Sequence, residues 1–260
     1  MNYLHLHTWH GEHRNPTPIL ALHGFTGSGL DFACFTSFTS FQFSWYAPDL
    51  MGHGQTRISS NPRDYLLDTH VHYLDLASEQ IAKPFILLGY SMGGRLALKY
   101  ALERPHFIKQ LILISSTPGI LDNYERILRL QSDELLASKI LTEGVPNFID
   151  FWQEQDLIKS QKYIPSSIYE PMLKRRYKNN ALGLANSLKN MGTGSMQPLW
   201  PRLHEIKFPV TLITGEDDVK FTKIAHEIKH YVKNAEHMII SNAGHEAIWS
   251  QNYRVMAALC

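Results

Sequence analysis

Cysteine, long apolar runs and net charge are all scarce in this chain. Two cysteines, Cys34 and Cys260, among 260 residues make no disulfide framework, which agrees with a reducing compartment. No apolar stretch has the length of a membrane span, and Met1 to His5 lack the charged and hydrophobic segments of a secretory leader. A formal charge of +1 provides no field that would attract nucleic acid or an anionic membrane. We therefore expect a cytoplasmic protein, monomeric or weakly homo-oligomeric, with no nucleic-acid or membrane partner.

Histidine, by contrast, is plentiful, and four histidines gather near the start of the chain: His5, His7, His10 and His13. The alternation of His5 and His7 would place both rings on one face of a strand, as a metal site can require. No cysteine or carboxylate ligand set accompanies them in the sequence, as a zinc or other transition-metal site would require. We predict a solvated strand edge and no metal site.

One stretch joins a buried strand to a helix through a Gly-x-Ser-x-Gly turn. Phe85 to Leu88 is a short apolar run typical of a strand covered on both faces, and Leu96 to Glu103 has helical spacing. A turn this tight strains its central residue, Ser91, and exposes the hydroxyl at its tip. Free N–H groups at the start of the helix favour developing negative charge. Ser91 is therefore the candidate nucleophile.

A glycine-rich loop follows an earlier buried strand. The strand is predicted at Ile19 to Leu22, and the loop His23-Gly24-Phe25-Thr26-Gly27-Ser28-Gly29 comes directly after it. In proteins with a nucleophile turn, such a loop supplies one of the two backbone N–H groups that bind an oxyanion. We predict that these donors are the N–H groups of Phe25 and Met92. A phosphate-binding loop is the alternative, but no Gly-Lys-Ser/Thr follows and the dinucleotide spacing is not met.

Buried-strand runs alternate with helical runs along the chain. This alternation predicts an α/β fold with a mostly parallel central sheet flanked by helices. Further strands are predicted at Phe43 to Ala47, Leu111 to Ile114, Val210 to Thr214 and Met238 to Ile240, with an edge strand at Tyr3 to Trp9 and helices at Leu30 to Phe38 and Asp68 to Ile81, the second capped by Asp68.

The alternation stops for roughly 80 residues, longer than an ordinary connection. From Thr117 to about Trp200 no buried-strand run occurs, while residues 134–140, 147–152, 168–177 and 182–190 have helical periodicity. We expect a helical lid above the carboxyl ends of the strands, where open parallel sheets bind ligands. The predicted organisation is a core of residues 1–116 and 201–260 with an inserted lid of residues 117–200.

Two further residue types complete a catalytic set. An acidic pair follows the strand that ends at Thr214, and His245 follows the last strand, so the chain order Ser, Asp, His is that of the α/β-hydrolase fold. His245 would take the proton of Ser91, and a carboxylate would orient the ring. Asp217 and Asp218 compete for that role. We favour Asp218, because the turn before it would direct it toward His245, although spacing alone barely separates the two.

Three arginines bear on the ligand. Arg95 lies one helical turn after Ser91, near the positive end of the predicted helix, where a cation is unfavourable unless an anion lies close by. Arg129 and Arg176 fall in the predicted lid, and a guanidinium can bind a carboxylate through two hydrogen bonds. Each of the three, taken alone, fits an exposed or salt-bridged arginine better.

Several sequence motifs indicate a family resemblance, and that resemblance suggests a role for the three arginines. The chain contains Leu22-His23-Gly24-Phe25-Thr26-Gly27-Ser28, Asp49 to Gly54, Gly89-Tyr90-Ser91-Met92-Gly93-Gly94-Arg95, Ser116-Thr117-Pro118-Gly119, Phe151-Trp152, Gly192-Thr193-Gly194 and Gly215-Glu216-Asp217-Asp218-Val219-Lys220-Phe221. With these motifs, nearly the whole chain resembles the 2-succinyl-6-hydroxy-2,4-cyclohexadiene-1-carboxylate synthases, α/β-hydrolase-fold lyases of menaquinone and phylloquinone biosynthesis. It departs from that pattern at Met196, where the family has Gln, and around Ile248 and Ser250, where a further His and Glu are usual.

The resemblance implies an activity and a set of site residues. The reaction would be elimination of pyruvate from 2-succinyl-5-enolpyruvyl-6-hydroxy-3-cyclohexene-1-carboxylate, a small tricarboxylate, with no cofactor and no metal. The implied residues are the triad Ser91, Asp218 and His245, the carboxylate-binding Arg95, Arg129 and Arg176, and the pocket aromatics Tyr90 and Trp152. Two alternatives stay open on the same fold: a carboxylesterase or C–C bond hydrolase with a covalent serine, and a receptor-like binder without catalysis.

Overall fold

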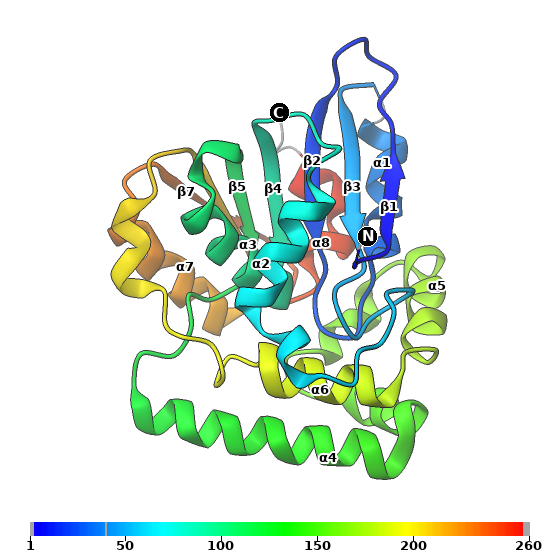
Figure 1. The fold of residues 1–260 in the computed structure, drawn as a ribbon. Helices are drawn as coiled ribbons and strands as arrows, with labels where there is room; N and C mark the ends of the chain where they lie inside the picture. Colours follow the sequence, from blue (N-terminus) through cyan, green and yellow to red (C-terminus); the bar gives the residue numbers. More distant parts are fainter. Residues whose placement is uncertain (1–2, 40, 257–260) are drawn as a thin grey trace.

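A seven-stranded sheet forms the centre of the molecule, whose computed structural model describes residues 3–39 and 41–256 (Figure 1). The strand order is β1-β3-β2-β4-β5-β6-β7, with β1 antiparallel to β3 and all other neighbours parallel. The predicted α/β fold is therefore confirmed. The strands are β1 Leu6–Trp9, β2 Thr17–Leu22, β3 Phe43–Pro48, β4 Phe85–Tyr90, β5 Ile108–Ile114, β6 Val210–Gly215 and β7 Ala235–Ile240. Cys260 lies outside the described residues.

Helices cover both faces of the sheet and one of its ends (Figure 1). The α-helices are α1 Ala33–Thr39, α2 Leu67–Ala77, α3 Met92–Glu103, α4 Asn123–Gln153, α5 Ser166–Arg176, α6 Ala181–Met191, α7 Val219–Tyr231, α8 Ala247–Ser250 and α9 Asn252–Met256. Short 3₁₀ helices are η1 Gly29–Phe32, η2 Pro62–Tyr65, η3 Pro105–Phe107, η4 Lys159–Tyr163 and η5 Trp200–Glu205. Among these helices, none combines the length and apolarity that a membrane span requires.

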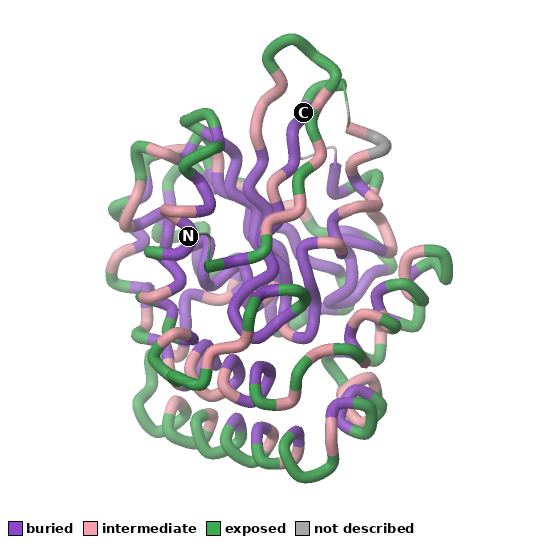
Figure 2. Tube along the Cα trace, turned by 45° about the vertical axis from the view of Figure 1, so that its right-hand side comes forward, coloured by how far each residue is buried: buried purple, intermediate pink, exposed green. Residues whose placement is uncertain are grey.

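Alternate residues of the central strands belong to two separate apolar clusters, one on each face of the sheet. Leu20 and Leu87 belong to a cluster with α2, α3 and α7, whereas their neighbours Ile19 and Ile86 belong to a cluster with α1 and α8. This division follows from the two-residue repeat of a strand, because successive side chains point to opposite faces. A strand buried on both faces must be apolar throughout, and all six residues of β4 are buried (Figure 2).

The segment between β5 and β6, residues 115–209, is called here the β5–β6 insertion. It carries α4, α5 and α6, and no strand is present in it. The helices α4 and α6 pack on each other through a third apolar cluster of their own. In Figure 1 they lie below the sheet, with α4 farthest from it, and the outer side of α4 is largely exposed in Figure 2.

Three local predictions differ from the structure. The two predicted helices at residues 134–140 and 147–152 are present, on either side of a break in α4 at Gly144 with φ 80° and ψ 163°, just before Pro146. Glycine tolerates that φ, and proline cannot donate a helical hydrogen bond. The difference is that the segment before the break already begins at Asn123. The cap of α2 is Leu66 rather than Asp68, which lies in the first turn. The first strand begins at Leu6 rather than Tyr3.

We predict that Gly93→Ala destabilises the fold. A Cβ on Gly93 would lie 2.2 Å from the carbonyl oxygen of Leu22, a backbone atom that cannot turn aside. Relief of this overlap has to separate α3 from β2, so the free energy of unfolding should fall by about 1–3 kcal/mol, the usual cost of overpacking a core. Urea denaturation measures the change, and a midpoint equal to that of the unaltered protein would show that the contact is looser than described.

Candidate active site

Ser91 lies at a strained turn between β4 and α3. Its φ of 51° and ψ of −109° are unusual for a residue with a side chain, and such strain is characteristic of functional positions. The turn closes because its glycines permit close packing: a Cβ on Gly89 would lie 2.5 Å from the carbonyl oxygen of Gly93. The N–H of Ser91 donates to the carbonyl of Ile114 at 2.9 Å, which ties the turn to β5. The Ser91 side chain is therefore presented from a rigid backbone at the end of the sheet.

A hydrogen-bonded relay links Ser91 to His245 and Asp218. The distance from Ser91 Oγ to His245 Nε2 is 3.0 Å, and that from His245 Nδ1 to Asp218 Oδ2 is 2.9 Å. His245 and Asp218 are both buried. The neighbouring Asp217 is exposed, and its backbone N–H donates to the carbonyl of Ala243. Of the two acids weighed from the sequence, only Asp218 contacts the histidine.

Two aromatic rings hold the imidazole of His245. The ring centroid of Tyr90 lies 5.3 Å from that of His245, and the centroid of Phe221 lies 4.8 Å from it. Trp249 packs edge-on against Tyr90 at 4.7 Å. This packing restricts rotation of the imidazole and keeps both of its nitrogens aligned with their partners, as proton transfer requires.

The loop between β2 and η1, which contains Phe25, lies beside Ser91. A Cβ on Gly24 would lie 3.6 Å from Ser91 Cβ, so the two segments are adjacent. Met92 is the first residue of α3, and its N–H has no acceptor within the helix. Within the described residues, the N–H of Phe25 has no backbone acceptor either. Both N–H groups are therefore available as hydrogen-bond donors in the two segments that adjoin Ser91.

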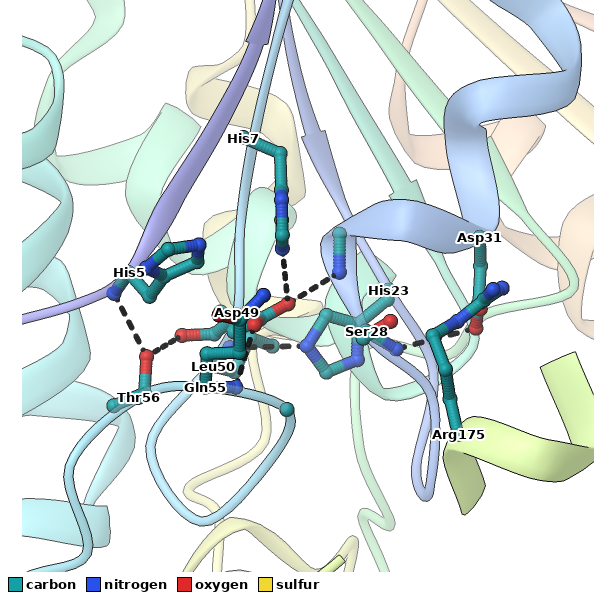
Figure 3. A network of polar contacts seen from close by, with 12 residues as sticks. His5, His7, His23, Ser28, Asp31, Asp49, Leu50, Gln55, Thr56 and Arg175 are labelled. Atoms are coloured by element: carbon teal, nitrogen blue, oxygen red, sulfur yellow. Dashed lines mark hydrogen bonds and ion pairs between the residues drawn. The ribbon is translucent and has the colours of Figure 1, made fainter. Parts of the chain in front are cut away.

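A polar network behind this loop fixes its course (Figure 3). The carboxylate of Asp49 accepts hydrogen bonds from the N–H groups of Gly29 and Gln55, each at 2.7 Å. His23 Nε2 accepts from the N–H of Leu50 at 2.9 Å, so its Nδ1 carries the proton and donates to the carbonyl of Gly24 at 2.8 Å. Burial lowers the pKa of His23, which keeps the ring neutral in this role.

An ion pair attaches the β5–β6 insertion to the same loop. Arg175 of α5 donates to Asp31 of η1 at 2.7 Å (Figure 3). Asp31 is buried, and it also accepts a hydrogen bond from the N–H of Ser28. Because the pair is only partly exposed, solvent screens it less than a surface pair.

A cavity of about 480 Å³ lies between the sheet and the β5–β6 insertion. Its volume suits a small organic ligand. Asp218, which lies behind His245, is the one predicted site residue that does not line it. The other predicted site residues all line this cavity: Phe25, Tyr90, Ser91, Met92, Arg95, Arg129, Trp152, Arg176 and His245.

The three arginines of the cavity differ in their partners. Arg95 Nη1 donates to the hydroxyl of Thr193 at 2.8 Å, and Arg176 Nη1 donates to the amide oxygen of Gln161 at 2.6 Å. Both guanidinium groups are buried, and within the described residues no carboxylate lies within 4.0 Å of either. Arg129 instead forms an ion pair with Asp133 at 2.9 Å.

Burial gives these side chains shifted proton affinities. Loss of solvation, together with the nearby Arg129 cation, lowers the pKa of Arg95 to about 9. Burial also raises the pKa of Asp133 and raises that of Tyr90. A buried cation without a carboxylate partner is costly unless an anion is bound. The cavity is therefore suited to a ligand with negative charges.

Sequence reasoning missed several polar residues that line the cavity, among them Thr193, Lys220 and Gln161. Thr193 and Lys220 lie within motifs singled out in the sequence, although neither was assigned a role. Burial and the Arg129 cation lower the pKa of Lys220. Gln161 belongs to η4, a short irregular element with no sequence motif, so no signal could have identified it.

One side-chain cluster away from the cavity has metal-ligating groups. Ligand atoms of His5, His7 and Asp49 lie within 4.8 Å of one another, so the fold brings a carboxylate from a distant part of the chain to the two histidines (Figure 3). The Asp49 carboxylate, however, already accepts hydrogen bonds from Gly29, Gln55 and His7. These bonds fix the loop described above, and a structural role accounts for the cluster.

Comparisons with known proteins agree with this geometry. A family model described as alpha/beta hydrolase fold matches residues 17–251. A Bacillus subtilis protein provisionally named 2-succinyl-6-hydroxy-2,4-cyclohexadiene-1-carboxylate synthase is 37% identical over 228 residues, which cover 87% of this chain and 83% of that protein. The synthase of that name from Photorhabdus laumondii is 28% identical over 209 residues, 78% of this chain and 72% of its own.

A solved structure is also similar to this chain. MenH from S. aureus superposes with a TM-score of 0.89 at 29% sequence identity, and the match covers 98% of this chain and 96% of that chain.

We predict that buried neutral histidines make the fold sensitive to acid. His70 is fully buried, accepts a hydrogen bond from the N–H of Met51 and donates one to Leu66, and burial lowers its pKa to about 4. Its folded pKa is below the unfolded value of 6.5, so the unfolded chain binds more protons as the pH falls. Stability is complete above about pH 7 and declines between about pH 6.5 and 4, by up to about 3 kcal/mol for this residue.

Urea denaturation at several pH values measures this decline. His70→Asn should reduce the slope of stability against pH, whereas His13→Asn, at an exposed position, should leave it unchanged. Equal slopes for the unaltered protein and His70→Asn would contradict the assignment.

Proposed function

The chain belongs to the α/β-hydrolase fold family and, within it, to the 2-succinyl-6-hydroxy-2,4-cyclohexadiene-1-carboxylate synthases, and on this basis we propose that it eliminates pyruvate from 2-succinyl-5-enolpyruvyl-6-hydroxy-3-cyclohexene-1-carboxylate. The observation that carries the proposal is the meeting of a Ser91 and His245 relay with buried, carboxylate-free arginines in one cavity. The relay can remove a proton, and the arginines can hold a polycarboxylate. An enzyme for a neutral ester would need only the first.

The relay acts as the base of the elimination. His245 takes the proton of Ser91, Asp218 stabilises the resulting imidazolium, and the serine oxygen removes the ring proton next to the succinyl ketone. The electron pair of that C–H bond forms an enolate, and its negative charge develops on the ketone oxygen. The N–H groups of Phe25 and Met92 stabilise this charge.

Collapse of the enolate completes the reaction. The electron pair moves through the ring double bond and breaks the C–O bond to the enolpyruvyl group. A second ring double bond forms, and the proton held on His245 returns to the departing group, which becomes pyruvate. No ester is hydrolysed, and no covalent bond to Ser91 forms. The three carboxylates of the substrate are assigned to Arg95, Arg129 and Arg176, with Tyr90 and Trp152 against the ring.

We also propose a division of labour along the chain. Residues 1–116 and 201–260 form the catalytic core, and residues 117–200 form a lid that contributes Arg129, Trp152 and Arg176 to the cavity. The enzyme acts in the cytoplasm as a monomer or weak homo-oligomer on its small-molecule substrate, with no nucleic-acid partner. The near-neutral charge and the two cysteines of the chain support this setting.

The test of the proposal is pyruvate release from the tricarboxylate, measured beside hydrolysis of a simple ester. The unaltered protein should release pyruvate and cleave the ester little or not at all. Ser91→Ala should reduce pyruvate release by about 10²- to 10⁴-fold, because the base is lost. Robust ester cleavage without pyruvate would instead identify a hydrolase, and neither activity would identify a binder.

A second prediction separates the two neighbouring acids. Asp218→Asn should reduce pyruvate release by about 10²- to 10⁴-fold. An amide has no charge to stabilise the imidazolium, and it does not hold the neutral ring of His245 with the proton on Nδ1. Asp217→Asn is the matched control, and it should retain the wild-type rate because its side chain is exposed. Equal losses in the two variants would contradict the assignment of Asp218.

A further inference from the structure

The three arginines of the cavity have two kinds of hydrogen-bond partner. Arg95 and Arg176 are held by neutral oxygen atoms, a hydroxyl and an amide, whereas Arg129 is held by a carboxylate. A neutral acceptor fixes the direction of a guanidinium but leaves its positive charge intact. A carboxylate fixes the direction and cancels the charge. The same residue type is therefore hydrogen-bonded to a neutral group at two positions and paired with a carboxylate at the third; Asp133 also attracts Arg95, but from beyond ion-pair distance.

Burial strengthens the effect of the charges on Arg95 and Arg176. Arg95 is 7% exposed and Arg176 is 4% exposed, so water cannot stabilise their charges as it would at the surface. The Nε of Arg176 has no hydrogen-bond partner in the described part of the chain. A buried charge with an unused donor is costly in the free protein and binds an incoming anion strongly, because the anion then meets a desolvated partner. Arg129 has a 35% exposed side chain and lacks this property.

Gln161 has a second contact that ties Arg176 to the relay. Its amide also lies near the Tyr90 hydroxyl, and Tyr90 directly precedes Ser91 and packs on His245. The Gln161 oxygen accepts from Arg176, so the part of the amide that remains available to Tyr90 is its NH₂ group. Gln161 is 4% exposed and comes from η4 of the β5–β6 insertion. One amide therefore sets the position of a guanidinium from the insertion relative to a residue of the core.

We propose that Gln161 and Thr193 are positioning residues that hold Arg176 and Arg95 in place without neutralising them, and so reserve these two cations for carboxylates of the ligand. Arg129, already paired with Asp133, contributes less to affinity. The inference rests on the proposed function in one respect: the carboxylates are taken to be those of the tricarboxylate. It adds the reason why an amide and a hydroxyl, rather than acids, contact the buried arginines.

A purely structural role for Gln161 makes the opposite prediction for one substitution. Gln161→Glu has the same shape, keeps the acceptor for Arg176 and converts a neutral contact into an ion pair. If Gln161 only joins the insertion to the core, this change should preserve or strengthen the structure and leave ligand binding intact. If Gln161 keeps Arg176 uncompensated, the new carboxylate occupies the place of the ligand's carboxylate.

The experiment compares Gln161→Glu with Gln161→Met, which removes the acceptor without adding charge. Binding of succinate is measured by calorimetry, and KM and kcat are measured by pyruvate release. We expect Gln161→Glu to weaken succinate binding and raise KM by roughly 10- to 100-fold, the usual value of a hydrogen bond to a charged group, with a smaller change in kcat. Gln161→Met should raise KM by less than about 10-fold.

Thermal unfolding tests whether weaker binding reflects a loss of structure. The melting temperature of Gln161→Glu should equal or exceed that of the unaltered protein, so weaker binding cannot be a sign of misfolding. Thr193→Asp and Thr193→Val repeat the comparison at Arg95, with the aspartate variant again the weaker binder. Succinate binding that is stronger or unchanged in both acidic variants overturns the inference.

The inference and the proposed function can fail separately. If the unaltered protein binds succinate but releases no pyruvate, the proposed function fails, while the comparison of the Glu and Met variants still decides the role of Gln161. If pyruvate is released and the acidic variants keep the wild-type KM, the function stands and the inference fails. Absence of succinate binding to the unaltered protein overturns the inference as well.

Discussion

The close approach of α3 to β2 is the constraint on which the active site depends. At Gly93 the helix backbone lies against the carbonyl of Leu22, with no space for a side chain between them. This contact brings the first turn of α3 beside the loop that follows β2. The strained backbone of Ser91 and the free N–H groups of Phe25 and Met92 are then consequences of one packing arrangement. A looser contact would move the serine away from these two N–H groups even with the side chains of Ser91, His245 and Asp218 present.

Much of this arrangement can be predicted from the sequence, because it depends on short-range patterns. Apolar runs identify β4 and its neighbours, and the turn around Ser91 joins a strand to a helix within a few residues. The chain order of Ser91, an acid and His245 then selects the fold. Asp218 could only be favoured over Asp217, since adjacent residues differ in direction rather than in spacing. The distance of 2.9 Å between Asp218 Oδ2 and His245 Nδ1 identifies Asp218 as the partner of the histidine, which the sequence pattern alone could not do.

Contacts between distant segments could not be predicted in this way. Gln161 contacts Arg176 of α5 and lies near Tyr90 of β4, and nothing in its local sequence indicates this. Asp49 joins His7 because β1 and β3 are antiparallel neighbours. The break of α4 at Gly144, by contrast, could be predicted, because it separates the two helical runs that the sequence shows.

Helices α4 and α6 share an apolar cluster of their own, although other residues of the β5–β6 insertion, among them Met172 and Met191, pack in the two clusters on the faces of the sheet. The buried residues between α4 and α6 can therefore change in sequence with little effect on the strands that support Ser91, His245 and Asp218. Part of the ligand choice can thus evolve separately from the reactivity of the relay. One sheet with one relay can serve acids, esters or other ligands in different descendants, provided that each insertion preserves its own packing.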